Sequence, residues 1–163
     1  MIRRTLAARS ACPVPCTRPR PCMSPETVVL IRQSWSQVMP RRKQVCGDFY
    51  RRLFATYPEL RPLFQDDLAR QTDLFVTMVN TVVSALDNPG PVLPLLETLG
   101  ARHAAYGVSD DDYDKFEAVL LDTLAASLGE TFTPTVRAAW SEVYGRLADR
   151  MRRGAANRCV HRR

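Results

Sequence analysis

The chain has 163 residues, of which 45% are hydrophobic and 25% are charged, and this suits one globular domain with a substantial core. Its net charge of +6 comes from its ends: residues 1–23 and 150–163 together carry eleven arginines and no acid, which leaves −5 for residues 24–149. A nucleic-acid-binding domain would carry positive charge on its folded face, and no apolar run reaches the roughly 20 residues that span a bilayer, so neither nucleic acid nor a membrane is an expected partner.

The first segment, residues 1–23, is basic and rich in proline and cysteine, and we expect it to be disordered. Cys12, Cys16 and Cys22 lie in this head and Cys159 lies near the other end, without the second ligand pair that a zinc site needs. Met23 directly precedes a clear helix start, which favours translation from that point and a dispensable head. An organelle transit peptide and disulfides within the ends stay open as alternatives.

The folded part should consist of six main helices and no strands. Ser24, Pro25 and Glu26 supply an N-cap residue, a proline at the first helical position and an early acid, so a helix should run from here to about Val38. Pro40 separates this helix from a second one over residues 41–57. Two prolines then bracket a short turn, which ends at residues 63–64.

The second half of the folded part is also predicted to be helical. An amphipathic helix is expected over residues 67–86, and the sequence DNPGP at 87–91 breaks it. A shorter apolar helix should end near residues 102–105 and be closed by Gly107, and Ser109 should cap the next one, which Gly129 ends. Thr133 and Pro134 open the last helix. The folded domain should cover residues 24–152, with a basic tail over 153–163.

His103 is the feature of the folded part that most suggests a function. It is the only histidine between residues 24 and 152, and its neighbours in LGARHAAYGV are small, so that a large group could approach the ring. Earlier in the chain, Gln71 interrupts an apolar helical stripe. A buried amide facing a buried imidazole needs partners, and a bound cofactor would supply them. A core histidine satisfied by its neighbours is the plainer alternative.

Several segments of the chain resemble those of the globin family. They are LIRQSW (30–35), YPELRPLF (57–64), LGARHAAYGV (99–108), LGETFTP (128–134) and RAAWSEVYG (137–145), and they agree with the family in order and spacing. The pattern is most similar to neuroglobin and to the bacterial single-domain globins. The resemblance implies an all-α globin fold, a sandwich of three helices over three around haem b, with iron as the functional metal.

The resemblance also implies roles for individual residues. His103 matches the proximal iron ligand, whose other ring nitrogen should donate to a carbonyl or a similar acceptor. Tyr50 and Gln71 match the distal catalytic pair of the flavohaemoglobins, whose O–H and N–H groups hydrogen-bond a diatomic ligand. The positions that match cofactor contacts are Phe64, Gln71, Phe75, Leu99, Arg102, His103, Val108, Tyr113 and Phe116.

Two departures from the family patterns qualify these roles. Gln71 stands where neuroglobins have a distal histidine, so the iron should be pentacoordinate or only weakly capped. Flavohaemoglobins also have a glutamate late in the last helix that hydrogen-bonds the proximal histidine, whereas RRGAANR at 152–158 contains no acid. A strong proximal push toward O–O cleavage is therefore not expected.

The implied function is dioxygen binding, and the Tyr50–Gln71 pair favours dioxygenation of nitric oxide to nitrate. Such an enzyme would need an external reductase, because the chain leaves no room for a flavin domain and contains no G-x-G-x-x-G motif. The alternatives are non-enzymatic oxygen transport, storage, scavenging or sensing and, from another class, a haem-free helical interaction module. We expect a cytoplasmic monomer or homodimer.

Overall fold

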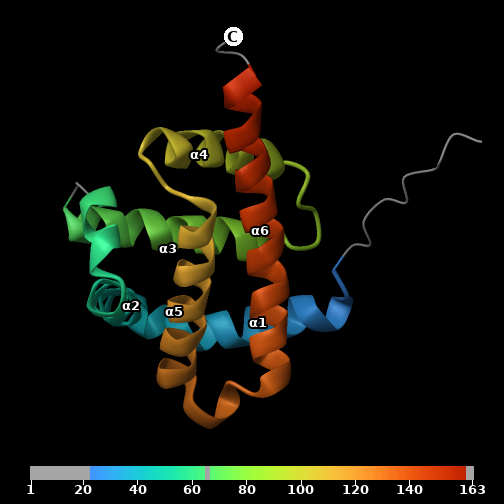
Figure 1. Cartoon of the computed structure of the whole chain (residues 1–163). Helices are drawn as coiled ribbons and strands as arrows, with labels where there is room; N and C mark the ends of the chain where they lie inside the picture. The colour runs from blue at the N-terminus through green and yellow to red at the C-terminus, as the bar shows by residue number, and fades with distance from the viewer. Residues whose placement is uncertain (1–22, 65–66, 161–163) are drawn as a thin grey trace, which may run out of the picture.

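The computed structural model describes residues 23–64 and 67–160, so the predicted head at 1–22 lies outside it. Figure 1 shows α5 and α6 running side by side in opposite directions, and α6 extends further to cross α4. No strand occurs in the described part, and none of its helices is long and apolar enough to cross a membrane. The helices are α1 (Pro25–Val38), α2 (Arg42–Thr56), α3 (Leu68–Ser84), α4 (Leu93–Ala105), α5 (Asp110–Leu128) and α6 (Pro134–Val160), with 3-10 turns at Met39–Arg41, Pro58–Leu63 and Gly129–Thr131.

Helix α1 begins, and helices α4 and α5 end, at the residues that the sequence predicts. The Ser24 hydroxyl accepts the Thr27 backbone N–H at 3.0 Å, and this satisfies one of the free N–H groups at the start of α1. Gly107 and Gly129 follow α4 and α5 with φ angles of +91° and +57°. A side chain is strained in this left-handed region, which is why glycine ends both helices.

The last helix differs from the expectation, because α6 continues to Val160. Residues 153–160, which the sequence analysis placed in a basic tail, are therefore helical, while the domain bounds of 24–152 stay a prediction. Arginine and alanine, which dominate this stretch, are good helix formers. Gly154 is also buried against α4, so this extension of α6 packs on the rest of the fold.

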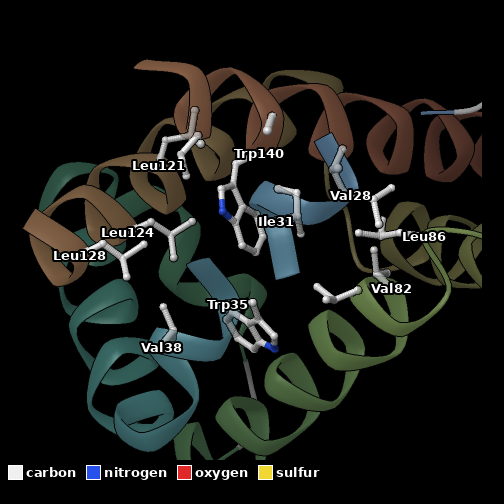
Figure 2. Packing of buried hydrophobic residues seen from close by; sticks show 14 of the residues in the cluster. Val28, Ile31, Trp35, Val38, Val82, Leu86, Leu121, Leu124, Leu128 and Trp140 are labelled. Atoms are coloured by element: carbon white, nitrogen blue, oxygen red, sulfur yellow. The ribbon is translucent and has the colours of Figure 1, made fainter. Parts of the chain in front are cut away.

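The main core is built around two tryptophans, Trp35 of α1 and Trp140 of α6, whose ring centroids are 6.1 Å apart (Figure 2). The Trp140 indole N–H donates to the Ser34 hydroxyl at 2.9 Å, and the Trp35 indole N–H donates to the Asn80 side-chain oxygen at 2.6 Å. Both polar ring atoms are therefore satisfied inside an apolar cluster. These contacts join α1 to α6 and to α3. The cluster also includes Val28, Ile31, Val38, Val82, Leu86, Leu121, Leu124 and Leu128.

Candidate functional site

His103 lies near the end of α4 and is half-buried. Its Nδ1 atom is 2.8 Å from the Leu99 carbonyl oxygen, one turn earlier in the same helix. Because a carbonyl can only accept, this hydrogen bond requires a proton on Nδ1 and leaves the lone pair of a neutral ring on Nε2. The local structure of α4 thus fixes the orientation and the tautomer that a metal-ligating imidazole needs.

Tyr113 of α5 borders His103, with ring centroids 6.2 Å apart. The Tyr144 hydroxyl donates to the Tyr113 backbone carbonyl at 2.8 Å, which joins α6 to α5 at this point. On the Tyr113 ring lies the guanidinium of Arg152, 5.2 Å from the ring centroid, and this group also forms an ion pair with Asp114 at 2.9 Å. The late part of α6 therefore places a cation beside Tyr113.

Tyr50 of α2 and Gln71 of α3 come together although they are distant in the sequence. Burial of Tyr50 raises the pKa of its phenol well above the usual value, and nearby Cys46 adds to this rise. The neighbouring Gln71 side chain acts in the opposite direction, because its amide favours the ionised phenol. The phenol is therefore protonated at neutral pH, so that Tyr50 can donate its O–H to a small acceptor.

Aromatic rings surround the Tyr50 side chain. The Tyr50 ring centroid is 5.6 Å from that of Phe64 and 6.4 Å from that of Phe75. Phe75 is in turn 5.6 Å from Phe116 of α5, and Phe116 stacks on Tyr144 at 6.1 Å. The contacts thus form a continuous path from the Tyr50 side to Tyr113 and His103. Phe64, Phe75 and Phe116 are only partly buried, so apolar ring surface stays available to a ligand.

The other predicted contact residues lie around α4. Leu99 is half-buried and supplies the carbonyl that orients His103. Val108 follows Gly107 and packs against the cluster of Tyr113 and Tyr144. Arg102 is exposed on α4. A β-carbon added to Gly107 would lie 3.9 Å from the Leu63 side chain, so the turn after α4 lies against the turn that leads to Phe64.

The sequence analysis did not single out two exposed leucines on the helices that carry Gln71 and His103. Leu74 is 53% exposed and follows Gln71 by one turn of α3, and Leu95 is 56% exposed and lies two turns before His103 on α4. Large exposed leucines on the two helices that carry Gln71 and His103 are apolar surface for a bound partner to cover. Leu74 could have been predicted from the sequence, because its spacing of three residues from Gln71 places both on the same helix face.

These residues fit haem. An imidazole with a free Nε2 lone pair is a suitable iron ligand, and it stands beside aromatic and aliphatic side chains that suit the flat apolar face of a porphyrin. One protein ligand is sufficient because the porphyrin supplies the other nitrogen ligands of its iron. An all-α fold with a histidine so oriented suits a haem-binding class of protein.

The comparisons with known proteins agree with this class. The model of the Globin family matches residues 47–151, and the chain belongs to the globin family. The expected globin fold is thereby confirmed. Among solved structures, an engineered carbene transferase from Rhodothermus marinus, assigned as a nitric oxide dioxygenase, is 27% identical with a TM-score of 0.76 and covers 84% of this chain and 96% of its own.

A hexacoordinated haem protein from an anhydrobiotic tardigrade has a TM-score of 0.73 at 16% identity, over 82% of this chain and 96% of its own, and it supports the fold alone. Among curated proteins, the flavohaemoprotein of Bacillus subtilis (strain 168) is 26% identical over 127 residues, or 76% of this chain and 32% of the relative. The flavohaemoprotein of Bordetella parapertussis is 28% identical over 130 residues, or 78% and 32%. The chain spans about a third of the length of these relatives.

Cys46 precedes Tyr50 by one turn of α2 and is a buried thiol, 2% exposed. It borders an apolar cavity of about 10 Å³ together with Trp35 and Phe75. Burial raises the pKa of the thiol from its ordinary value of 9.0 to about 11, because the thiolate would lose its hydration. The thiol is therefore protonated at neutral pH, and thiol reagents should modify it slowly.

This raised pKa makes stability depend on pH. The folded protein holds the Cys46 proton more tightly than the unfolded chain, so the stabilisation is complete below about pH 9 and is lost as the pH rises to about 11. The free energy of unfolding should fall by roughly 2–3 kcal/mol more in the wild type than in Cys46→Val over this range. Urea denaturation at each pH measures the difference. Parallel curves for the two proteins would mean that the thiol is not desolvated.

Proposed function

We propose that this globin binds haem b through His103, binds dioxygen beside Tyr50 and Gln71, and converts nitric oxide to nitrate. The observation that carries this proposal is the distal pair: a buried, protonated phenol that lies among aromatic rings and has the Gln71 amide as a neighbour. One dioxygen, one nitric oxide and one electron balance one nitrate ion. We propose a separate reductase as the source of the electron.

Haem, when bound, supplies the iron at which dioxygen binds and reacts. His103 would hold it through Nε2, while its Nδ1–H donates to the Leu99 carbonyl. Phe64, Phe75 and Phe116 would contact the porphyrin and exclude water. The neighbouring positions expected to complete these contacts are Leu99, Arg102, Val108 and Tyr113.

The distal residues would act as hydrogen-bond donors to a polar diatomic ligand. Dioxygen takes up partial negative charge on reaction with a reduced centre, and a phenol O–H and an amide N–H stabilise such charge. Aromatic rings around Tyr50 keep the local dielectric low, which strengthens both interactions relative to water. The two residues would thus retain and orient dioxygen for attack by nitric oxide.

The proximal side favours a second candidate function, reversible dioxygen binding without turnover. The hydrogen-bond partner of His103 Nδ1 is a backbone carbonyl, and the neighbouring charge is the Arg152 guanidinium over Tyr113. A neutral carbonyl makes the imidazole a weaker electron donor than a carboxylate would. Oxygen transport, storage, scavenging or sensing would need no more than this.

Nitric oxide consumption distinguishes the two functions. We expect the oxygenated protein, supplied with a reductase, to consume nitric oxide over many turnovers and to form one nitrate per nitric oxide. A nitric oxide electrode and nitrate analysis measure this. Tyr50→Phe should slow turnover, whereas Tyr106→Phe, at a tyrosine that is 69% exposed, should not. Consumption that stops after one equivalent of nitric oxide, with the reductase still active, would favour reversible binding.

A further inference from the structure

The backbones of α4 and α6 are in direct contact at two glycines. A β-carbon added to Gly100 of α4 would lie 1.9 Å from the Met151 carbonyl oxygen, and one added to Gly154 of α6 would lie 1.9 Å from the Glu97 carbonyl oxygen. Real β-carbons essentially never approach other atoms below 3.0 Å, so any side chain at either position would force the helices apart. Each glycine thus makes room for the backbone of the other helix, where the two helices cross in Figure 1.

This contact lies next to the atoms that orient His103. Gly100 directly follows Leu99, whose carbonyl oxygen accepts the His103 Nδ1–H, and it precedes His103 by one turn of α4. A rigid helix transmits a displacement at Gly100 to the imidazole. The distance between the two backbones therefore sets where the His103 ring lies relative to the rest of the fold.

Charged side chains of α6 hold the same region from both sides. Arg150 donates to the Glu97 carboxylate at 2.8 Å, and Glu97 is also the residue whose carbonyl faces Gly154. Arg152 forms an ion pair with Asp114 of α5 and lies over the ring of Tyr113, which borders His103. The end of α6 thus joins α4 and α5 around the histidine.

We propose that Gly100 and Gly154 are positioning residues for the proximal histidine. Their contact holds α4 close to α6 and so sets the position from which His103 Nε2 reaches the iron. The inference deepens the proposed function and rests on its assignment of His103 as the haem ligand. It also gives a role to residues 153–154, which lie beyond the domain end that the sequence predicted.

Alanine substitutions provide the test, with a matched control on α6. Gly100→Ala and Gly154→Ala should shift the iron–histidine stretching band of the ferrous protein in resonance Raman spectra and should speed haem loss to an acceptor apoprotein by roughly 10-fold. Gly145→Ala should change neither, because nothing lies within 4 Å of a β-carbon at Gly145. A merely structural role would lower the melting temperature and leave the band of the folded molecules where it is, and that result would overturn the proposal.

Measurements in a second variant, His103→Gly, distinguish the positioning role of the glycines from the assignment of His103 as the haem ligand. In His103→Gly supplied with free imidazole, the ligand is no longer attached to α4, so Gly154→Ala should leave the iron–imidazole band unchanged. A shift that persists in this background would overturn the positioning role. A normal haem spectrum in His103→Gly without imidazole would instead refute the ligand assignment and, with it, the proposed function.

A charge-reversal pair tests the contact if neither alanine variant folds. Glu97→Arg places two guanidinium groups together at the crossing without adding atoms to either backbone, and it should shift the band and speed haem loss by about 3-fold. Combining it with Arg150→Glu should restore both readouts. An unchanged band in Glu97→Arg would show that the α4–α6 contact does not position His103.

Discussion

Replacing His103 by alanine is expected to abolish stable haem binding. His103 is the residue whose orientation leaves an imidazole nitrogen free for iron, since its Nδ1–H is used by the Leu99 carbonyl. Loss of a group that merely orients a metal ligand typically costs 10–100-fold in affinity, so loss of the ligand itself should cost at least the upper end of that range. The Soret band of the purified variant and its rate of haem loss to an acceptor apoprotein measure the effect.

Two controls accompany this variant. His161→Ala, at a residue outside the described part of the chain, should leave the spectrum unchanged. His103→Gly with added imidazole should recover a spectrum close to that of the wild type, because the free base can occupy the space of the side chain. Full haem retention with a wild-type spectrum in His103→Ala would show that another residue is the ligand.

Removing both distal donors should speed the release of dioxygen by roughly a hundredfold. The variant is Tyr50→Phe with Gln71→Leu, which keeps the approximate volume of both side chains and removes their O–H and N–H groups. If the two hydrogen bonds together hold about 3 kcal/mol, the factor follows from about 1.4 kcal/mol per tenfold change. Stopped-flow displacement of dioxygen from the ferrous protein measures it.

The effects of the two single variants on the free energy of dioxygen release should not add up to the effect of the double variant. Tyr50 and Gln71 are neighbours and would both donate to one ligand, so removing one changes what the other can do. Carbon monoxide, which is less polar when bound, should be released at nearly the same rate from all four proteins. An unchanged dioxygen release rate in the double variant would mean that the two side chains do not face the ligand, and the dioxygenase proposal would lose its main support.

The sequence by itself determined the six helices and, apart from the end of α6 at Val160, approximately where they begin and end. Ser24 and Pro25, Gly107 and Gly129, and Pro134 act through the backbone within a few residues of their own positions, so their effects can be read without a tertiary structure. The His103–Leu99 hydrogen bond is of the same kind, since it joins neighbouring turns of one helix. The family resemblance, carried by ordered segments, also came from sequence, and the match of the Globin model to residues 47–151 agrees with it.

Only the tertiary structure decided which of these helices and residues contact one another. The approach of Gln71 to Tyr50 depends on how α2 crosses α3, and the place of Arg152 over Tyr113 depends on how far α6 extends. Gly100 and Gly154 are the clearest case. In sequence, each is a helical glycine that costs about 1 kcal/mol relative to alanine. The cost is tolerated because each glycine lies against the backbone of another helix, more than 50 residues away along the chain. No local sequence pattern predicts this contact.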